Sequence, residues 1–586
     1  MAKDTQTMFK DLTQRYFHWK MKCYPIFATV QGIREYDGLM PDRSLKAVEH
    51  NKSQCEQFLR ETKGVLAIPG CHLSHKQIRY LNLMIFEVKS CLVGHSLGGH
   101  FFPEVNFLEG VQDKLPRYMT LEHFCKLETV EDCNLVLARL SSVSRYCEGM
   151  IEALEAGMKA GMTYSIEALS RVPKQFERLQ VQDVTQSAFY APFMAMSKTV
   201  NIGQEDVLRI QTEAQNIIKQ TVLPGLKHLS TFINDIYSRS IRKSPSISSL
   251  PNGDEFYKAC LQFHSSVKDL TPEYVHLLGV KLVRELLEGV SKVAKSVGWN
   301  GGPQEFLKHV QNDPKQRFQS KAELVEYIQD MIKNKIGPKM KDVIEDRFLT
   351  PEFYHVDVEP LPPGNGAMAY YSRASQDGRQ KAAFWLNLEK VENFKKFELM
   401  SLALHEAIPG HHFHLTLFNQ MYGFPDFVKN PVYDDISLSP SRVPFYTAHI
   451  EGWGLYSEYL GFEMGLFENP YDLLGYYSWN LLRSVRLVVD TGLHHYNWTR
   501  EQALTYLTEN TALSRRNSEG DIDRYITWPG QSISYKLGQI KILEFREQEQ
   551  LHWGDKFDLK KFHTRVLARI GPLDELSSST LEYDES

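Results

Sequence analysis

Cysteine is scarce in this sequence. Its eight cysteines all lie within the first 260 of 586 residues, and none belongs to a C-x-x-C pair. This density is too low for a disulfide-held scaffold, so we expect unpaired thiols in a reducing compartment. No cysteine follows Cys260, and a metal bound in the second half would therefore need histidine and carboxylate ligands.

Long apolar runs and a large excess of one charge are also missing. No stretch of 18 apolar residues occurs, and the charged N-terminus lacks the apolar segment of a signal peptide. Lys and Arg number 67 against 72 Asp and Glu, interspersed along the chain, which leaves no basic stripe for nucleic acid. These absences predict a globular, cytoplasmic protein without nucleic-acid or membrane partners. The oligomeric state leaves no local signature.

Helical periodicity dominates what is present. Apolar residues recur with a 3.6-residue period over residues 151–169, 205–237, 274–297, 324–335 and 394–407. Short strands do not alternate with helices, so the sequence predicts a mainly α fold rather than a doubly wound sheet.

The chain is expected to have two regions. Residues 238–254 are rich in Ser, Pro and Gly and indicate an exposed boundary. This boundary separates an N-terminal helical region, residues 1–245, from a metal-binding catalytic region, residues 255–586. The latter is expected to be one continuous cleft-forming unit. A second loop-like segment, residues 359–366, opens its more informative part.

A small β structure is predicted just before the main motif. Residues 367–372 and 382–388 are short β-type runs separated by a turn-rich segment, which indicates a hairpin with a long loop. An edge strand beside a His-Glu helix could bind an extended peptide through main-chain hydrogen bonds.

The main motif is a cluster of histidines beside a glutamate. His405 and Glu406 begin it, and His411 and His412 follow after Pro409. The familiar H-E-x-x-H pattern places both ligands on one helical face at i and i+4, but here proline occupies i+4. The helix must bulge or break there, which could bring either later histidine to a metal; we favour His411 over His412. The alternative is a histidine-rich polar surface.

A third ligand is expected downstream. Glu451 and Glu458 are seven residues apart and so share one helical face. We expect Glu451 to bind the metal and Glu458 to orient a ligand histidine, with Glu458 as the alternative ligand. His405, His411 and Glu451 would then form a zinc site with an open position for water, and Glu406 would act as its general base.

Together these motifs resemble a large, poorly characterised family described as zinc-dependent peptidases with an H-E-x-x-P-G-H-H signature. The order and spacing agree over roughly residues 360–550 through the segments HEAIPGHH, EGWGLYSE, DTGLH and PGQ…YKLG. The resemblance implies a mainly helical fold similar to deep-cleft zinc peptidases such as thimet oligopeptidase, angiotensin-converting enzyme and carboxypeptidase Taq. By the same analogy, Tyr535 would stabilise the oxyanion, although a core tyrosine is an equal alternative.

One further helix carries a polar stripe. Arg483, Arg486, Asp490 and His494 are spaced to share one face of an otherwise apolar helix. The arginines could grip the carboxylate of a peptide C-terminus, and His494 or His495 could donate to the oxyanion or leaving amine. The alternative is a buried ladder of ion pairs.

A competing motif is the G-x-S-x-G pattern around Ser96. In an α/β-hydrolase this serine is the nucleophile, at a sharp turn between a strand and a helix. Here the preceding stretch is helical in character and Pro103 follows too soon, so a glycine-rich helix connection is favoured.

The sequence therefore predicts a zinc-dependent hydrolase that cleaves short peptides, with carboxypeptidase-like cleavage as one option. Three alternatives stay open: a zinc hydrolase of a non-peptide amide or ester, a serine hydrolase using Ser96, and a non-catalytic protein that binds a metal or a peptide. The first shares the water-activation chemistry, and the last would have no need of Glu406 beside a ligand.

Overall fold

The computed structural model describes residues 4–578 except 121–123, 126, 197–201, 362–366, 422 and 433–439, so most of the predicted loop 359–366 lies outside the described residues. The fold is mainly helical, as predicted. The helices of the first half are α1 Thr5–Cys23, α2 Pro25–Val30, α3 Leu45–Leu66, α4 His75–Ser96, α5 Val111–Met119, α6 Val130–Ser141, α7 Val143–Ala160, α8 Ile166–Leu169, α9 Val172–Glu177, α10 Ala191–Ala195, α11 Gln204–Ile217 and α12 Leu223–Asp235.

The second half adds longer helices around the candidate site. They are α13 Gly253–Ser265, α14 Pro272–Ser296, α15 Pro303–Asn312, α16 Lys321–Asp330, α17 Pro351–Tyr354, α18 Leu399–Glu406, α19 His411–Gln420, α20 Asp426–Lys429, α21 Thr447–Glu463, α22 Pro470–His494, α23 Arg500–Asn510, α24 Arg515–Thr527, α25 Ser534–Trp553, α26 Leu559–Leu567 and α27 Leu573–Ser578. No helix of the described part is both long and apolar enough to cross a bilayer.

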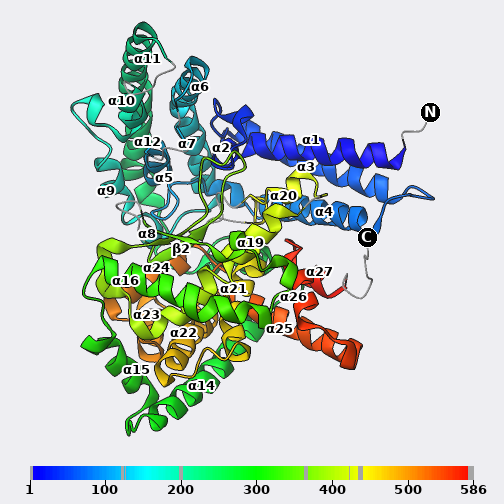
Figure 1. The fold of residues 1–586 in the computed structure, drawn as a ribbon. Coiled ribbons are helices and arrows are strands. Elements are labelled where there is room, and N and C mark those ends of the chain that lie inside the picture. Colours follow the sequence, from blue (N-terminus) through cyan, green and yellow to red (C-terminus); the bar gives the residue numbers. More distant parts are fainter. Residues whose placement is uncertain are drawn as a thin grey trace.

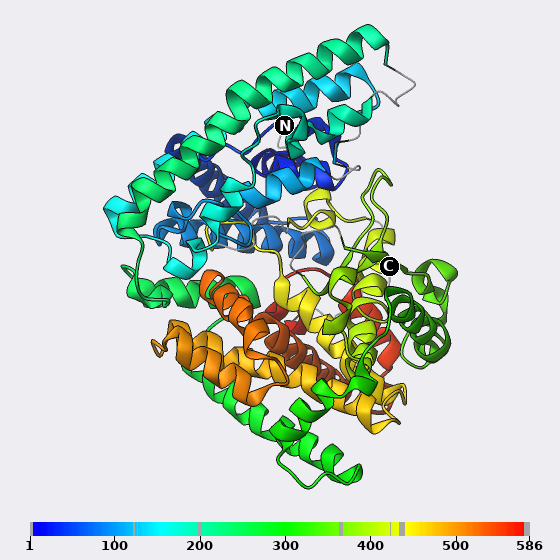
Figure 2. The same cartoon turned by 90° about the vertical axis from the view of Figure 1, so that its left-hand side faces the viewer.

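Helix ends differ from the predicted periodic segments where glycine or local hydrogen bonding intervenes. The segment 151–169 is split because Gly161, with φ 74°, ends α7 in the left-handed conformation. The segment 205–237 forms α11 and α12, joined by a π-helical turn at Ile218–Val222. Figure 2 shows these as one long rod across the top of the molecule. The segment 274–297 matches α14 closely.

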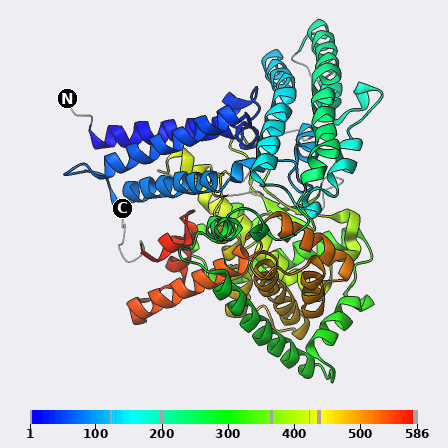
Figure 3. The same cartoon turned by 180° about the vertical axis from the view of Figure 1, so that it is seen from behind.

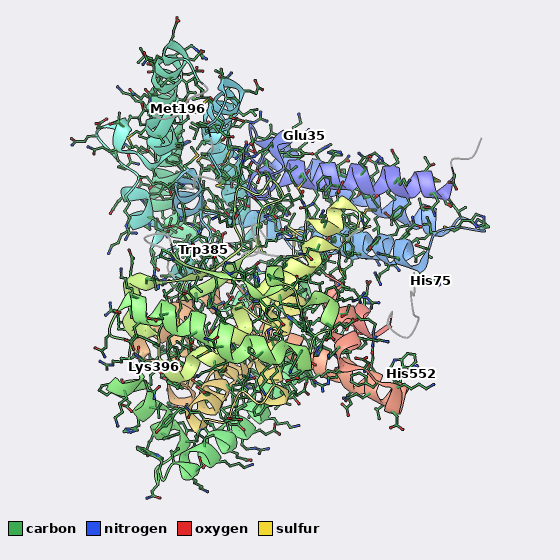
Figure 4. All side chains as sticks on the ribbon, viewed as in Figure 1. Glu35, His75, Met196, Trp385, Lys396 and His552 are labelled. Atoms are coloured by element: carbon green, nitrogen blue, oxygen red, sulfur yellow. The ribbon has the colours of Figure 1, made fainter. Side chains whose placement is uncertain are left out.

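The small sheet has three strands rather than a hairpin alone. The strands β2 Ala369–Ser372 and β3 Ala383–Leu386 pair antiparallel, as the sequence predicts. A third strand, β1 Asp357–Pro360, pairs parallel to β3, so the order is β1-β3-β2 and β2 lies at an edge. Figure 4 places Trp385 of β3 near the level where the upper and lower halves of the molecule meet.

Helices from the two halves of the sequence share apolar cores. In Figure 1, α1, α3 and α4 lie in the upper part of the molecule and α14, α22 and α23 in the lower part. The short helix α20, from the second half, packs against α1, and Phe427 is buried with Tyr16 and Phe58. Figure 3 shows the same grouping from behind. The division at residues 245–255 stays a prediction.

The segment 238–254 is exposed in part and covered in part. Ser246 is fully buried, and Ile247 and Leu250 are 5% and 6% exposed. Ile247 N–H donates to Nδ1 of His494, 247 residues away, at 3.1 Å. Ser- and Pro-rich composition indicates a turn, but whether the turn is covered depends on tertiary packing.

Helix α22 is the centre of the second half. It packs along α14 and also contacts α18, α23, α24 and α25. From Leu481 to His494 every side chain is buried, including two arginines, an aspartate and a histidine. Buried polar groups need partners, so the partners of these four residues decide their roles.

Candidate metal centre

The predicted interruption of the histidine helix is present. Helix α18 carries His405 in its last turn, and α19 begins at His411 after a break that includes Pro409 and Gly410. A Cβ atom at Gly410 would lie 1.9 Å from the carbonyl oxygen of His405, so the chain can turn this tightly only with glycine. Trp453 Nε1 donates to the carbonyl oxygen of Pro409 at 2.8 Å, which ties the break to α21.

Three side chains converge across this break. Glu451 Oε2, from the first turns of α21, lies 3.3 Å from His405 Nε2 and 3.5 Å from His411 Nε2. One ligand atom from each of the three residues lies within 4.8 Å of the others, so the group could hold a metal ion. A tetrahedral metal with bonds of about 2.0–2.1 Å separates its ligand atoms by roughly 3.3–3.4 Å. Both distances from Glu451 Oε2 match this separation, so the group could hold a metal ion of this size.

The two alternative ligands lie outside this group. His412 Nδ1 is 3.3 Å from the hydroxyl of Tyr371 on β2. Glu458 Oε1 is 2.9 Å from His405 Nδ1, on the ring edge that faces away from Glu451. Of the two candidate histidines, the structure therefore brings His411 into the group. Glu458 has the geometry of a residue that orients His405, since a ligand histidine usually donates its other nitrogen to such an acceptor.

The buried carboxylates shift the pKa values of His405 and Glu451. Burial alone would lower the pKa of His405, but hydrogen bonds to Glu451 and Glu458 raise it to about 9. Burial would raise the pKa of Glu451, but hydrogen bonds from His405 and His411 hold it well below its usual range. Without a metal, a proton on His405 compensates the buried negative charge, and this proton must leave when a cation binds.

Glu406 lies between the metal group and the sheet. It is 8% exposed, and its charge acts on His405. The backbone N–H of Tyr371 on β2 donates to Glu406 Oε2 at 2.9 Å. Sequence reasoning did not single out Tyr371; the β-type run immediately before the His-Glu helix was the available signal. The proposed general base is thus held at the edge strand.

The two arginines of α22 have different partners. Arg483 Nη2 lies 3.7 Å from Glu458 Oε1, and Nη1 donates to the carbonyl oxygen of Trp479 at 3.3 Å. Its guanidinium also stacks over the Trp479 ring at 4.4 Å. Arg483 therefore supports the carboxylate that orients His405, and is not left open for a substrate as the sequence suggested.

Arg486 instead contacts Tyr525 and Tyr535. Its Nε donates to the hydroxyl of Tyr525 at 2.9 Å, and its guanidinium lies 5.0 Å from the ring centroid of Tyr535. Burial raises the pKa of Tyr535, and the nearby charge of Glu451 raises it further, whereas Arg524 and Arg486 lower it. Tyr535 is thus within electrostatic reach of the metal group, as the predicted oxyanion role requires, and its hydroxyl is protonated at neutral pH.

Asp490 does not pair with either arginine. Its carboxylate accepts hydrogen bonds from the Tyr257 hydroxyl at 2.7 Å, the Gly530 N–H at 3.0 Å and the Ser532 hydroxyl at 2.8 Å. The alternative of a buried ladder of ion pairs along α22 therefore does not describe this helix. Asp490 instead fixes the Pro-Gly turn that leads into α25.

His494 has a different environment from the one expected. Nδ1 accepts from the Ile247 N–H, and Nε2 donates to the carbonyl oxygen of Tyr525 at 2.9 Å. Burial lowers its pKa to about 3, so the ring is neutral. Both ring nitrogens are engaged by backbone groups, which leaves none to donate to an oxyanion. His495 Nε2 lies 2.8 Å from Glu273 Oε1.

Ser96 lies at the end of a regular helix rather than at a strand-to-helix turn. Its hydroxyl donates to the carbonyl oxygen of Val93, one turn back in α4, at 2.7 Å. Gly94, the first glycine of the pattern, faces the backbone of Ser441, where a Cβ atom would lie 1.9 Å from the backbone nitrogen. Close packing of two chain segments therefore accounts for this glycine.

Gly454 is a residue of the site that sequence reasoning missed. A Cβ atom there would lie 2.6–2.9 Å from three atoms of the His405 ring. We expect Gly454→Ala to displace this ring and to lower metal affinity roughly 10–100-fold, the usual cost of disturbing a ligand's surroundings. Competition with a graded series of chelators measures it. Gly64→Ala in α3, where nothing lies within 4 Å, is the matched control, and equal affinities in the two variants would contradict the close packing.

Comparisons with known proteins place the chain in a family. No curated protein matches it. A solved structure described as a putative lipoprotein from Colwellia psychrerythraea is 25% identical over 98% of both chains, with a TM-score of 0.87. Another, described as a putative lipoprotein of unknown function from Shewanella oneidensis, is 17% identical over 98% of this chain and 100% of the other, with a TM-score of 0.74. A solved structure described as a putative oligoendopeptidase F from Bacillus anthracis is 13% identical over 91% of this chain and 95% of the other. Its TM-score of 0.31 is too low to support an argument about function. The family "Bacterial protein of unknown function (DUF885)" matches residues 25–574, and the chain therefore belongs to this family.

Proposed function

We propose that this protein is a zinc-dependent hydrolase, and specifically a metallopeptidase that cleaves short peptides. The observation that carries the proposal is the convergence of His405, His411 and Glu451 beside Glu406. A site built only to bind a metal needs no carboxylate of this kind next to its ligands. The family resemblance of the HEAIPGHH and EGWGLYSE segments points to the same chemistry.

Each residue of the site would have a distinct role. Bound zinc would act as a Lewis acid that polarises the scissile carbonyl and makes water more acidic. Glu406 would take a proton from the attacking water and pass it to the leaving nitrogen. Glu458, supported by Arg483, would accept the Nδ1 proton of His405 and so keep Nε2 directed at the metal. The Tyr535 hydroxyl would donate a hydrogen bond to the developing oxyanion.

An extended peptide is the substrate class that the sheet favours. Strand β2 pairs with β3 on one side, and within the described residues its other side has no strand partner. The Tyr371 N–H bonded to Glu406 belongs to this strand. A peptide added along β2 by main-chain hydrogen bonds would pass the general base. The deep cleft expected from the resemblance remains part of the proposal.

Two measurements test the proposed function. Purified protein should contain about one zinc per chain, and a synthetic peptide library should be digested with new termini visible by mass spectrometry. Glu406→Gln should retain the zinc and lose the digestion. Protein that contains zinc and leaves every peptide intact, but hydrolyses simple amides or esters, would favour the non-peptide alternative. Labelling of Ser96 by a fluorophosphonate in the presence of chelator would favour the serine hydrolase.

Zinc affinity should depend steeply on pH. Because the pKa of His405 is raised to about 9 in the metal-free protein, zinc must displace one proton from this ring below that pH. We expect affinity to rise about tenfold per pH unit between pH 7 and 9 and then to level off. Calorimetric titration in buffers of different ionisation enthalpy measures the proton release. Affinity that stays constant over this range would show that His405 binds no proton in the metal-free protein.

Of the two arginines on α22, Arg486 is the one that could recognise the carboxylate of a peptide C-terminus. Within the described residues only its Nε has a hydrogen bond, so its outer nitrogens can take a bidentate partner. We expect peptides with a free C-terminus to be cleaved faster than their amidated forms. Arg486→Lys should reduce this ratio roughly 10–100-fold, because lysine cannot form the bidentate pair. Comparing kcat/KM for both peptide forms measures the ratio, and equal rates in the wild type would remove this role.

The similar solved structures bear on the cellular location of the protein. Two similar solved structures are described as putative lipoproteins, which favours a location outside the cytoplasm over the cytoplasmic one expected from composition. Fractionation of cells that express the full natural chain would decide between the two.

A further inference from the structure

The backbone just before α21 has an unusual conformation. Tyr446, the residue that precedes the helix, has φ 58° and ψ 39°, a left-handed conformation that residues other than glycine rarely adopt. Its carbonyl oxygen accepts hydrogen bonds from His449 N–H at 2.9 Å and from Ile450 N–H at 3.3 Å, so Tyr446 is part of the first helical turn. Glu451, the proposed metal ligand, is the next residue along the helix. The position of Tyr446 therefore bears directly on that of Glu451.

A buried carboxylate from the first half of the chain holds the Tyr446 side chain. The Tyr446 hydroxyl donates to Oε1 of Glu87, on α4, at 2.7 Å. Both residues are buried, with exposed fractions of 2% for Tyr446 and 1% for Glu87. Burial, with the charge of Glu87 nearby, raises the pKa of Tyr446, so its hydroxyl keeps the proton that it donates. Glycine would adopt the left-handed backbone at lower cost, but it could not make this contact.

Glu87 is itself fixed by two residues of α1. Its Oε2 accepts hydrogen bonds from the Tyr16 hydroxyl at 2.6 Å and from Lys20 Nζ at 3.0 Å. The Lys20 side chain is fully buried, so solvent screens this ion pair very little. A buried charge that moves away from its partner is left uncompensated at high cost, and the pair therefore resists displacement. Tyr446 is thus bonded to an anchor that belongs to α1 and α4.

A second set of contacts holds α21 just beyond Glu451. A Cβ atom at Gly452 would lie 2.5 Å from the backbone of Gly538 on α25, and Trp453 is hydrogen-bonded to the break between α18 and α19. Glu451 therefore lies between two fixed points, one at Gly452 and Trp453 and the other at Glu87. Metal–ligand distances tolerate shifts of only about 0.2 Å, so a small displacement of the helix start would disturb the metal group.

We propose that Tyr446 is a positioning residue for the metal centre: held by Glu87, it sets the start of α21 and so places Glu451 opposite the two ligand histidines. This role rests on the metal centre proposed above, and it makes α1 and α4 part of the support of that centre. The alternative is that the Tyr446 hydroxyl contributes only to stability.

Tyr16 offers a matched comparison for Tyr446. Each of the two tyrosines donates one hydroxyl hydrogen bond to the same carboxylate, at 2.6 Å from Tyr16 and 2.7 Å from Tyr446. Both are buried, at 0% and 2% exposure. Only Tyr446 borders the helix that carries Glu451, whereas Tyr16 lies within α1. The two hydroxyls therefore differ in their connection to the metal group and not in the kind of bond that they make.

The test measures metal binding by the full chain, with Co²⁺ as the probe. Co²⁺ binds the same kinds of ligand as zinc, and its visible absorption reports the arrangement of those ligands. Tyr446→Phe should alter this spectrum and weaken Co²⁺ affinity about three- to tenfold, less than the 10–100-fold typical of residues that touch a ligand directly. Tyr16→Phe should lower the melting temperature by a similar amount, because it removes an equivalent hydrogen bond. It should leave the spectrum unchanged and the affinity within about twofold.

Three results would overturn this role. Affinity and spectrum equal to the wild type in Tyr446→Phe would mean that the contacts beyond Glu451 place it without Tyr446. Equal losses of affinity in both tyrosine variants would mean that lower stability alone explains the effect. A wild-type chain that takes up neither Co²⁺ nor zinc would remove the proposed metal centre, and the positioning role with it.

A second variant covers the case in which Tyr446→Phe does not fold. Glu87→Asp keeps the negative charge that pairs with Lys20 but withdraws the carboxylate from the Tyr446 hydroxyl. It should alter the Co²⁺ spectrum and weaken affinity in the same way. A spectrum and an affinity like those of the wild type would contradict the proposed role of the Glu87 contact.

Discussion

Glu406→Gln is expected to lower kcat by about 10²–10⁴-fold while zinc content stays near one per chain. General-base catalysis by a positioned carboxylate typically contributes this much, and glutamine cannot accept the proton. Glutamine can still accept the hydrogen bond from the Tyr371 N–H through its carbonyl oxygen, so the local structure should persist. Steady-state kinetics on a peptide identified from the library digest, with zinc measured on the same samples, gives the result.

The control for this variant is Glu463→Gln. Glu463 lies at the end of α21 and pairs with Arg546 at 2.6 Å, away from the metal group. It should leave both activity and zinc content unchanged. If Glu406→Gln keeps full turnover, the proton is transferred by another group. If it loses zinc instead, Glu406 belongs to the metal-binding group, and the proposed division of roles is wrong.

Tyr535→Phe is expected to lower kcat/KM by about 10²–10³-fold, the usual cost of removing one oxyanion donor. Phenylalanine keeps the ring that Arg486 contacts and removes only the hydroxyl. Zinc affinity should be unchanged, since Tyr535 is not part of the ligand group. Kinetics on the same peptide and a chelator competition together measure both quantities.

Tyr525→Phe separates this role from an effect on Arg486. Tyr525 accepts a hydrogen bond from Arg486, and the neighbouring charges that act on its pKa are those of Arg486, Asp521 and Arg524. If Tyr535 stabilises the oxyanion, its variant alone should reduce kcat, whereas Tyr525→Phe should mainly raise KM for peptides with a free C-terminus. Equal losses in both variants would mean that each tyrosine acts only by holding the arginine.

Several features of the site follow from local chemistry and were predictable from sequence. The adjacent His405 and Glu406 indicate a catalytic metal, and Pro409 requires a helix break because proline cannot continue the hydrogen-bonding pattern. Helical spacing places Glu451 and Glu458 on one face. These inferences concern residues within about two helical turns, where backbone geometry fixes what neighbours can do.

Other assignments depended on contacts between distant segments. The sequence alone favoured His411 over His412 only narrowly. The packing of α19 decides between them, because it places His411 beside Glu451 of α21 and His412 beside Tyr371 of β2. The parallel partner of β3 was not predicted because it lies across a long connection in the chain. Periodicity carries no information about such pairings.

The stripe on α22 shows this division clearly. The sequence by itself determined that Arg483, Arg486, Asp490 and His494 share one buried helix, because an apolar segment of period 3.6 has to be covered. Only the tertiary structure decided their partners, which are Glu458, Tyr525, Tyr257 and Ile247 in turn. The physical reason is that helical spacing fixes the direction in which a side chain points, whereas the packing of helices from elsewhere in the chain fixes what it meets there.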